Sequence, residues 1–354
     1  MNPKRILLIR TDRIGDVVLS TPAIKAVRDS YPDSYIAVMV KPYAKDIVEG
    51  NPYLNEVIVY DKDGVHNSFF ATLIFGLGLR RKRFDTAVIL HPTNRSHIVA
   101  FLAGIPNRVG YEKKMAFLLT KKINDKKFLG EKHELDYTLD ILKNIGVVPK
   151  DRDLYVPVKS SSENAINIKL AREGKSGSGL LIAVHPGASC PSKRWPAERF
   201  ALLIDRLKER YEFQIVVVAG PADAAEAAEL KKNLKSDVIN LSGKTSVGEL
   251  AALFKKCRLF ISNDSGPVHI ASAVGTPCVV IFGRKQRGLG PKRWGPTGKS
   301  DIVLHKDVGC AVCLAHNCKN GFKCLRAITV DDVFSAVTII LGKQGGKWGQ
   351  ILFS

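Results

Sequence analysis

The chain of 354 residues has no long hydrophobic run. Its longest apolar segments, such as Ile215–Ala219 and Cys278–Phe282, have the length of a β-strand, whereas a membrane-spanning helix needs about 20 apolar residues. The apolar start at Ile6–Ile9 is interrupted by charged residues from Arg10 onward, before the core of a signal peptide is complete. We therefore expect a protein without a transmembrane segment that stays in the cytoplasm.

Acidic residues are scarce relative to basic ones. The 34 Asp and Glu residues face 54 Lys and Arg residues, which gives a formal net charge of +20. Such an excess indicates an anionic partner, and nucleic acid, a phospholipid surface or a phosphorylated small molecule all fit the charge. Basic runs such as Arg80–Arg83 lack the interleaved aromatic residues of RNA-binding motifs. We therefore expect a solvated or membrane-facing basic surface and no nucleic-acid partner.

The cysteines do not form the even set of a disulfide framework. There are seven, and without an export signal they favour reduced thiols or a metal site. Cys310, Cys313, Cys318 and Cys324 have C-x2-C-x4-C-x5-C spacing, compact enough for a structural zinc or iron–sulfur site. Reduced thiols bracing a loop explain the pattern equally well, and both alternatives stay open.

Short apolar runs that alternate with helical stretches predict the fold. Continuous Val/Ile/Leu strands separated by helices indicate α/β domains with doubly wound parallel sheets. The strands expected from this pattern are 5–9, 36–40, 57–60, 86–90, 180–184, 215–219, 238–241, 259–262 and 278–282. Two such series predict two domains, 1–172 and 180–329, joined by a Gly/Ser-rich linker at 173–179 and followed by a helix and tail at 330–354.

The loop after the first strand carries a cluster of charges. Arg10, Asp12, Arg13 and Asp16 lie within seven residues of one another, directly before an amphipathic stretch. Asp16 alone reads as an ordinary helix cap. A carboxylate among guanidinium groups, however, stays ionised and can act as a general base.

Two loops of the second half are suited to phosphate. The segment His185–Pro196 follows a strand and contains Ser189 and Lys193, which offer a hydroxyl group and a point charge. A second segment, Asn263–His269, joins another strand to a helix start, where free N–H groups favour anions. The simpler interpretations are an ordinary loop around a buried tryptophan for the first segment and a helix cap at Asp264 for the second. The occurrence of both segments in one domain favours an anion site.

Taken together, these loops resemble the ADP-heptose:lipopolysaccharide heptosyltransferases of glycosyltransferase family 9, and heptosyltransferase II in particular. The resemblance extends over nearly the whole chain. Besides the three loops above, it rests on Gly50–Tyr53, Phe101–Pro106, Arg108–Tyr111, Leu241–Thr245 and Gly275–Pro277, in the order found in the family.

The resemblance implies an inverting enzyme of GT-B architecture, with two Rossmann-like domains that face each other across a cleft. Domain 1–172 would bind the acceptor, and domain 180–329, with its cysteine-rich loop 310–324, the nucleotide-sugar. Asp16 corresponds to the catalytic base of the family, and Arg10 and Thr11 would support the reacting centre.

The same resemblance assigns the donor site and the partners. The residues that would bind the donor are Ser189, Lys193, Asp223, Asp264, Ser265, Gly266 and His269. ADP-heptose would be the donor and the lipid A-core region the acceptor, at the inner face of the cytoplasmic membrane, and no metal cofactor would be required for the chemistry. The alternatives are a related transferase with another nucleotide-sugar or acceptor glycan and, in a different class, a non-catalytic nucleotide- or nucleic-acid-binding protein.

Overall fold

The computed structural model describes residues 3–174 and 179–343. Most of the predicted linker and the predicted tail therefore lie outside the described residues. The chain divides into two compact units, Met1–Pro157 and Val158–Ser354, so the first unit ends earlier than the predicted boundary at 172. Helix α7 (Ser160–Arg172) belongs to the second unit because it packs on α10 (Val247–Lys256) and buries Ile166 and Leu170.

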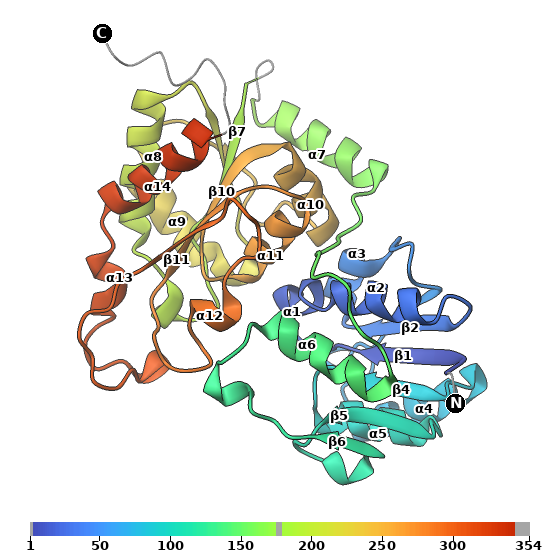
Figure 1. The fold of residues 1–354 in the computed structure, drawn as a ribbon. Coiled ribbons are helices and arrows are strands. Elements are labelled where there is room, and N and C mark those ends of the chain that lie inside the picture. The colour runs from blue at the N-terminus through green and yellow to red at the C-terminus, as the bar shows by residue number, and fades with distance from the viewer. Residues whose placement is uncertain (1–2, 175–178, 344–354) are drawn as a thin grey trace. The chain divides into compact units, whose positions relative to one another are not determined.

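The first unit contains a six-stranded parallel sheet in the order β3-β2-β1-β4-β5-β6. Its strands are β1 (Arg5–Ile9), β2 (Tyr35–Val40), β3 (Glu56–Val59), β4 (Thr86–Ile89), β5 (Asn107–Tyr111) and β6 (Lys121–Ile123). Its helices are α1 (Ile14–Val18), α2 (Thr21–Ser30), α3 (Lys45–Val48), α4 (Phe69–Gly78), α5 (Asn94–Leu102) and α6 (Glu134–Leu142). Helices cover both faces: α2 packs with α6 on one side, and α4 packs with α5 on the other (Figure 1).

The second unit repeats this architecture with the strand order β12-β11-β10-β7-β8-β9. Its strands are β7 (Leu181–His185), β8 (Gln214–Val217), β9 (Ile239–Asn240), β10 (Cys257–Asn263), β11 (Cys278–Phe282) and β12 (Ile302–His305). Its other helices are α8 (Ala197–Arg210), α9 (Ala224–Asn233), α11 (Gly266–Ala273), α12 (Pro291–Trp294), α13 (Lys323–Ala327) and α14 (Val330–Lys343). Helix α14, predicted to follow this domain, contributes Val333, Val337 and Ile340 to the core of the unit.

The predicted α/β class with two doubly wound parallel sheets is confirmed, and all nine predicted strands are present. Of the three strands that the pattern missed, β6 and β12 are edge strands, and β5 is a partly polar strand between β4 and β6. Edge strands are solvated along one side, so they lack the continuous apolar run that marks a central strand. The described helices include none with the length and apolar character needed to cross a bilayer.

Each strand order has one point where the chain reverses its direction of travel across the sheet. In the first sheet this point lies between β1 and β4, and in the second between β7 and β10. Loops at the carboxyl ends of the two strands diverge there and leave a crevice, which is where open α/β sheets bind ligands. The loop Arg10–Asp16 follows β1, and the loops that begin at Pro186 and Asp264 follow β7 and β10. The fold therefore places all three predicted loops at these points.

A capping box fixes the start of α10. The Ser246 hydroxyl accepts a hydrogen bond from the Glu249 N–H, and the Glu249 carboxylate accepts one from the Ser246 N–H. We expect Ser246→Ala to lower the free energy of unfolding by about 1 kcal/mol, because the Glu249 N–H loses its side-chain acceptor. Urea unfolding measures the loss. Ser246→Thr keeps the hydroxyl and should remain close to wild type, and an equal loss in both variants would contradict the capping argument.

Candidate active site

A buried arginine organises the reversal point of the first sheet. Arg10 directly follows β1 and is only 2% exposed. Its guanidinium group donates to the Leu90 carbonyl oxygen at the end of β4 (3.0 Å), and its Nη2 lies 2.6 Å from Asp16 Oδ1. Arg10 therefore joins the ends of the two strands that border the crevice and holds the Asp16 side chain there.

Three carboxylates surround the Arg10 guanidinium group. Besides Asp16, Asp12 Oδ1 lies 2.9 Å from Nε, and Glu134 Oε1 lies 3.5 Å from Nη2. Burial disfavours the charged form of Arg10, but the negative charges of Asp12, Asp16 and Glu134 outweigh it and raise the pKa of Arg10. The guanidinium therefore stays charged, and it is a permanent partner for the Asp16 carboxylate.

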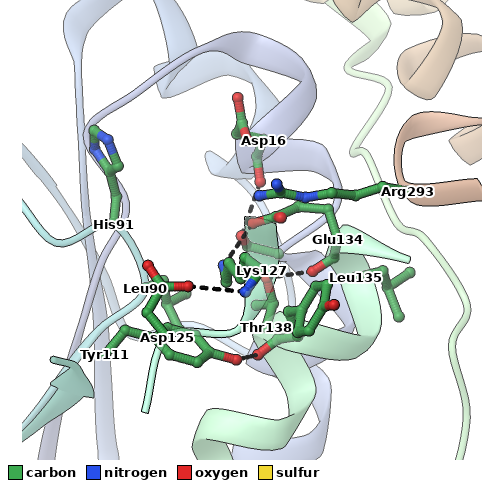
Figure 2. Close-up of polar contacts among 12 residues, drawn as sticks. Asp16, Leu90, His91, Tyr111, Asp125, Lys127, Glu134, Leu135, Thr138 and Arg293 are labelled. Carbon is green, nitrogen blue, oxygen red and sulfur yellow. Dashed lines mark hydrogen bonds and ion pairs between the residues drawn. The ribbon is translucent and has the colours of Figure 1, made fainter. Parts of the chain in front are cut away.

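Glu134 is supported from a second direction. It is the first residue of α6, is 2% exposed, and accepts a charge-assisted hydrogen bond of 2.7 Å from Lys127 Nζ, as Figure 2 shows. Lys127 Nζ also lies 4.6 Å from the centre of the Tyr111 ring. The Tyr111 hydroxyl donates to the Tyr137 carbonyl oxygen on α6 (2.7 Å). This network ties α6 to β5 and keeps Glu134 facing Arg10.

Two further titratable groups, Asp12 and His91, lie near Arg10. Burial, together with the charges of Asp16 and Glu134, raises the pKa of Asp12 to about 7, although the Arg10 charge opposes the shift. His91, just after β4, is affected in the opposite sense: burial and then the Arg10 and Lys62 charges lower its pKa to about 3. His91 is therefore neutral at physiological pH, and it can accept or donate one hydrogen bond without adding charge.

An open, basic pocket lies in the same unit. Its volume is about 350 Å³, and it is lined by Lys62, Asp63, Thr93, Asn94, Arg95 and Lys114. The Arg95 guanidinium group donates to the carbonyl oxygens of Lys62 (2.7 Å) and His66 (3.2 Å), which fixes the loop on one side of the pocket. Burial and then the neighbouring Lys41 charge lower the pKa of Lys62. Crowded cations beside the amino end of α5 make this pocket suited to an anion.

In the second unit, Asp264 holds two cations at the reversal point. Its Oδ2 lies 3.0 Å from Lys193 Nζ and 2.8 Å from Arg284 Nη2. Asp264 and Arg284 are both about 5% exposed, and Arg284 Nε has no hydrogen-bond partner within the described part of the chain. Two cations with one carboxylate leave a local positive charge, which fits an anionic ligand such as a diphosphate.

The start of α11 is arranged around His185. The Ser265 hydroxyl lies 2.9 Å from that of Ser262, and both lie 3.4 Å from His185 Nδ1. The other ring nitrogen, Nε2, lies 3.4 Å from Asp223 Oδ2. Burial alone would raise the pKa of Asp223, but the hydrogen bond from His185 and the Arg194 charge lower it. His185 therefore links the end of β7 to Asp223 and to the start of α11.

The remaining predicted residues differ in how they are placed. Ser189 is exposed on the loop after β7, and Gly266 and His269 lie on the first turns of α11, where His269 is buried. Thr11 is buried beside Arg10. A side chain at Gly187 would place its Cβ 2.2 Å from the Asp223 carboxyl carbon, so a residue without a side chain is needed for Asp223 to lie against the loop.

The four clustered cysteines do not form a ligand set in the structure. Cys310, Cys313, Cys318 and Cys324 are all free thiols, and no group of three or more His, Cys, Asp or Glu within residues 3–174 and 179–343 is arranged to hold a metal ion. Two of the thiols accept hydrogen bonds, from Asn320 Nδ2 (3.3 Å) and from the Phe322 N–H (3.4 Å). Both contacts connect these thiols to residues of the same loop.

Sequence reasoning missed several of the residues that complete the two sites. His91 and Arg284 each follow a predicted strand, β4 and β11, so the rule that ligands bind at strand carboxyl ends points to both. Glu134 and Lys127 have no such signal. Both are distant from Arg10 in the sequence. Glu134 lies beside Arg10 because α6 packs beside α2, and Lys127 pairs with Glu134.

The two six-stranded parallel sheets, each with charged loops at its reversal point, match the GT-B fold. A glycosyltransferase family 9 protein from Veillonella parvula has the same fold, with a TM-score of 0.86 and 28% identity over 96% of this chain and 98% of its own. The ADP-heptose LPS heptosyltransferase II of Escherichia coli also shares it, with a TM-score of 0.79 and 23% identity over 96% of this chain and 99% of its own.

Sequence comparison identifies the family. Residues 73–323 match the profile of glycosyltransferase family 9 (heptosyltransferase). Lipopolysaccharide heptosyltransferase 2 of Escherichia coli K12 is 27% identical over 290 residues, which cover 79% of this chain and 82% of that protein. The chain belongs to glycosyltransferase family 9, the heptosyltransferases, as the loops of the sequence predicted.

The raised pKa of Asp12 makes the stability of the first unit depend on pH. Because this pKa, about 7, lies above the ordinary value of 3.8, the folded state holds the proton after the unfolded state has released it. The stabilisation is therefore complete below about pH 4 and is lost as pH rises through 7. We expect the free energy of unfolding of wild type to fall relative to that of Asp12→Asn across this window.

Urea unfolding at several pH values measures the difference. Asp33→Asn, which removes an exposed carboxylate of the same unit, controls for the general effect of losing one negative charge. Parallel stability curves for wild type and Asp12→Asn would show that Asp12 does not hold a proton in the folded state.

Proposed function

We propose that the protein transfers heptose from ADP-L-glycero-D-manno-heptose to the heptose/Kdo inner core of lipopolysaccharide, with inversion at the anomeric carbon. Family membership and the similarity to lipopolysaccharide heptosyltransferase 2 support this proposal. The observation that carries it is the Asp16 carboxylate, held 2.6 Å from a buried Arg10 at the reversal point of the first sheet.

In the proposed step, Asp16 is the catalytic base. The acceptor hydroxyl transfers its proton to an Asp16 carboxylate oxygen while the hydroxyl oxygen forms a bond to the anomeric carbon. The bond between that carbon and the diphosphate oxygen breaks on the opposite face, and ADP leaves with the electron pair. Arg10 orients Asp16, and the buried Thr11 supports the same loop.

The second unit would stabilise the leaving ADP. Lys193 and Arg284 provide two cations, and the free N–H groups at the start of α11, from Gly266 onward, add the positive end of a helix. Ser189, Ser265 and His269 complete the proposed donor contacts, with Asp223 beside the ribose or adenine. Because these groups can neutralise the charge that develops on the diphosphate, we propose that the chemistry needs no divalent metal.

The basic pocket of the first unit is the proposed acceptor subsite. Lys62, Arg95 and Lys114 line it, and the inner-core region carries the carboxylates of Kdo and phosphate groups that such cations attract. A lipid-anchored acceptor also implies that the enzyme works at the inner face of the cytoplasmic membrane.

The base is tested by turnover with ADP-heptose and a Kdo-lipid A or heptosylated-core acceptor. We expect acceptor-dependent ADP release and a product heavier by one heptose, and Asp16→Asn should lower kcat by about 10²–10⁴-fold with ADP affinity unchanged. Asp33→Asn is the matched control on the surface of the same unit. Turnover by Asp16→Asn at the wild-type rate would exclude Asp16 as the base. Absence of transfer to either acceptor, by protein that binds ADP, would favour another nucleotide-sugar or acceptor glycan.

The donor site is tested by ADP binding in calorimetry. Lys193→Met and Arg284→Met should each weaken ADP binding by about 10–100-fold, because a hydrogen bond to a charged group contributes about 1.5–3 kcal/mol. Arg287→Met removes an exposed arginine from the same loop as Arg284 and should bind ADP like wild type. Equal affinities for Arg284→Met and Arg287→Met would remove Arg284 from the site.

A further inference from the structure

Helix α4 is apolar on its outer face as well as on its inner face. On the inner side, Thr72 and Gly76 are buried, and a Cβ at Gly76 would lie 2.9 Å from Leu102 Cβ on α5. The outer side carries Phe69, Phe70, Ile74 and Leu77, which are 60%, 75%, 71% and 45% exposed. Phe70, Ile74 and Leu77 have the i, i+4, i+7 spacing of one helix face, and Phe69 is exposed at the first residue of the helix. A helix that is apolar all round is normally buried, whereas the outer face of α4 is exposed to solvent.

A run of cations follows this face without interruption. The 3-10 helix η2 (Leu79–Lys82) continues α4, and Arg80, Arg81 and Arg83 are exposed. Arg80 Nε donates to the Leu102 carbonyl oxygen (2.8 Å), which holds this run against the end of α5. Four exposed apolar side chains beside a basic run form the pattern of a segment that lies in a membrane interface, with its apolar side chains among the acyl chains and its cations on anionic headgroups.

We infer that the outer face of α4, together with Arg80–Arg83, docks the protein onto an anionic phospholipid bilayer. The inference deepens the proposed function, on which it rests for the need to reach a lipid-anchored acceptor. The loop that lines the basic pocket with Lys62 and Asp63 leads directly into α4. A bilayer bound at α4 therefore places lipid headgroups next to the pocket proposed for the acceptor sugars, while the acyl chains remain in the membrane.

Charge complementarity selects this occupant over a second copy of the chain. The net charge of the protein is +20, and two copies that met face to face through α4 would bring their basic runs together, at a cost in repulsion. An anionic bilayer accepts both the apolar side chains and the cations without such a cost.

The test is sedimentation of the full chain with vesicles of phosphatidylglycerol and phosphatidylethanolamine. Phe70→Gln with Ile74→Gln should lower the partition coefficient by about tenfold or more, since two exposed apolar side chains no longer enter the bilayer. Arg80→Gln with Arg81→Gln should lower it by roughly 25-fold and weaken its salt dependence, because each cation near an anionic surface contributes about a factor of five.

Matched controls come from the second unit. Ile168 and Leu202 are 53% and 54% exposed on α7 and α8, and Lys231 and Lys232 are adjacent exposed cations on α9. Gln variants of these two pairs should bind vesicles like wild type. Thermal unfolding checks that every variant remains folded, as expected for substitutions of exposed side chains.

Three outcomes would overturn the inference: no binding by wild type, equal binding by the α4 and control variants, or equal wild-type binding to phosphatidylcholine vesicles. A dimer in lipid-free light scattering that Phe70→Gln with Ile74→Gln converts to a monomer would instead assign the face to a second copy. Transfer to a water-soluble acceptor without acyl chains keeps the two proposals distinguishable. The α4 variants should retain this transfer, and its absence in wild type would count against the proposed function and not against the docking surface.

Discussion

The parallel pairing of buried strands is the constraint on which this structure depends. Each sheet has helices on both faces, so its central strands are largely apolar and polar groups collect in the loops. Because the strands are parallel, the loops after β1 and β4 lie at the same end of the first sheet, and those after β7 and β10 lie at the corresponding end of the second sheet. Charged side chains collect at these ends because the interiors of the sheets are apolar and buried.

In both units a buried charged side chain is held by ion pairs at the carboxyl end of the sheet, and the sign of the charge differs between the units. In the first unit a buried cation, Arg10, is surrounded by three carboxylates, which leaves a negative excess that suits a base. In the second unit a buried carboxylate, Asp264, holds two cations and leaves a positive excess that suits a diphosphate. A buried charge without such partners would cost several kcal/mol. The ion pairs therefore keep the side chains in place before any ligand binds.

The outer face of α4 is apolar and differs from the polar outer face that is usual for a surface helix. The pocket residues Lys62 and Asp63 precede this helix in the chain, and the basic run follows it. The loop of the proposed base, the anion pocket and the apolar face thus occur in one unit, as the proposed transfer to a lipid-anchored acceptor would require.

The sequence by itself determined the class of fold, the nine most apolar strands and the loops that carry Asp16, Lys193 and Asp264, because period, turn chemistry and strand ends are local properties. Tertiary structure alone decided which distant side chains complete each site. Glu134 reaches Arg10 through the packing of α6, and Arg284 reaches Asp264 through the pairing of β10 with β11. It also decided that α7 belongs with the second unit. These outcomes depend on packing between segments far apart in the chain, and local sequence patterns do not encode that packing.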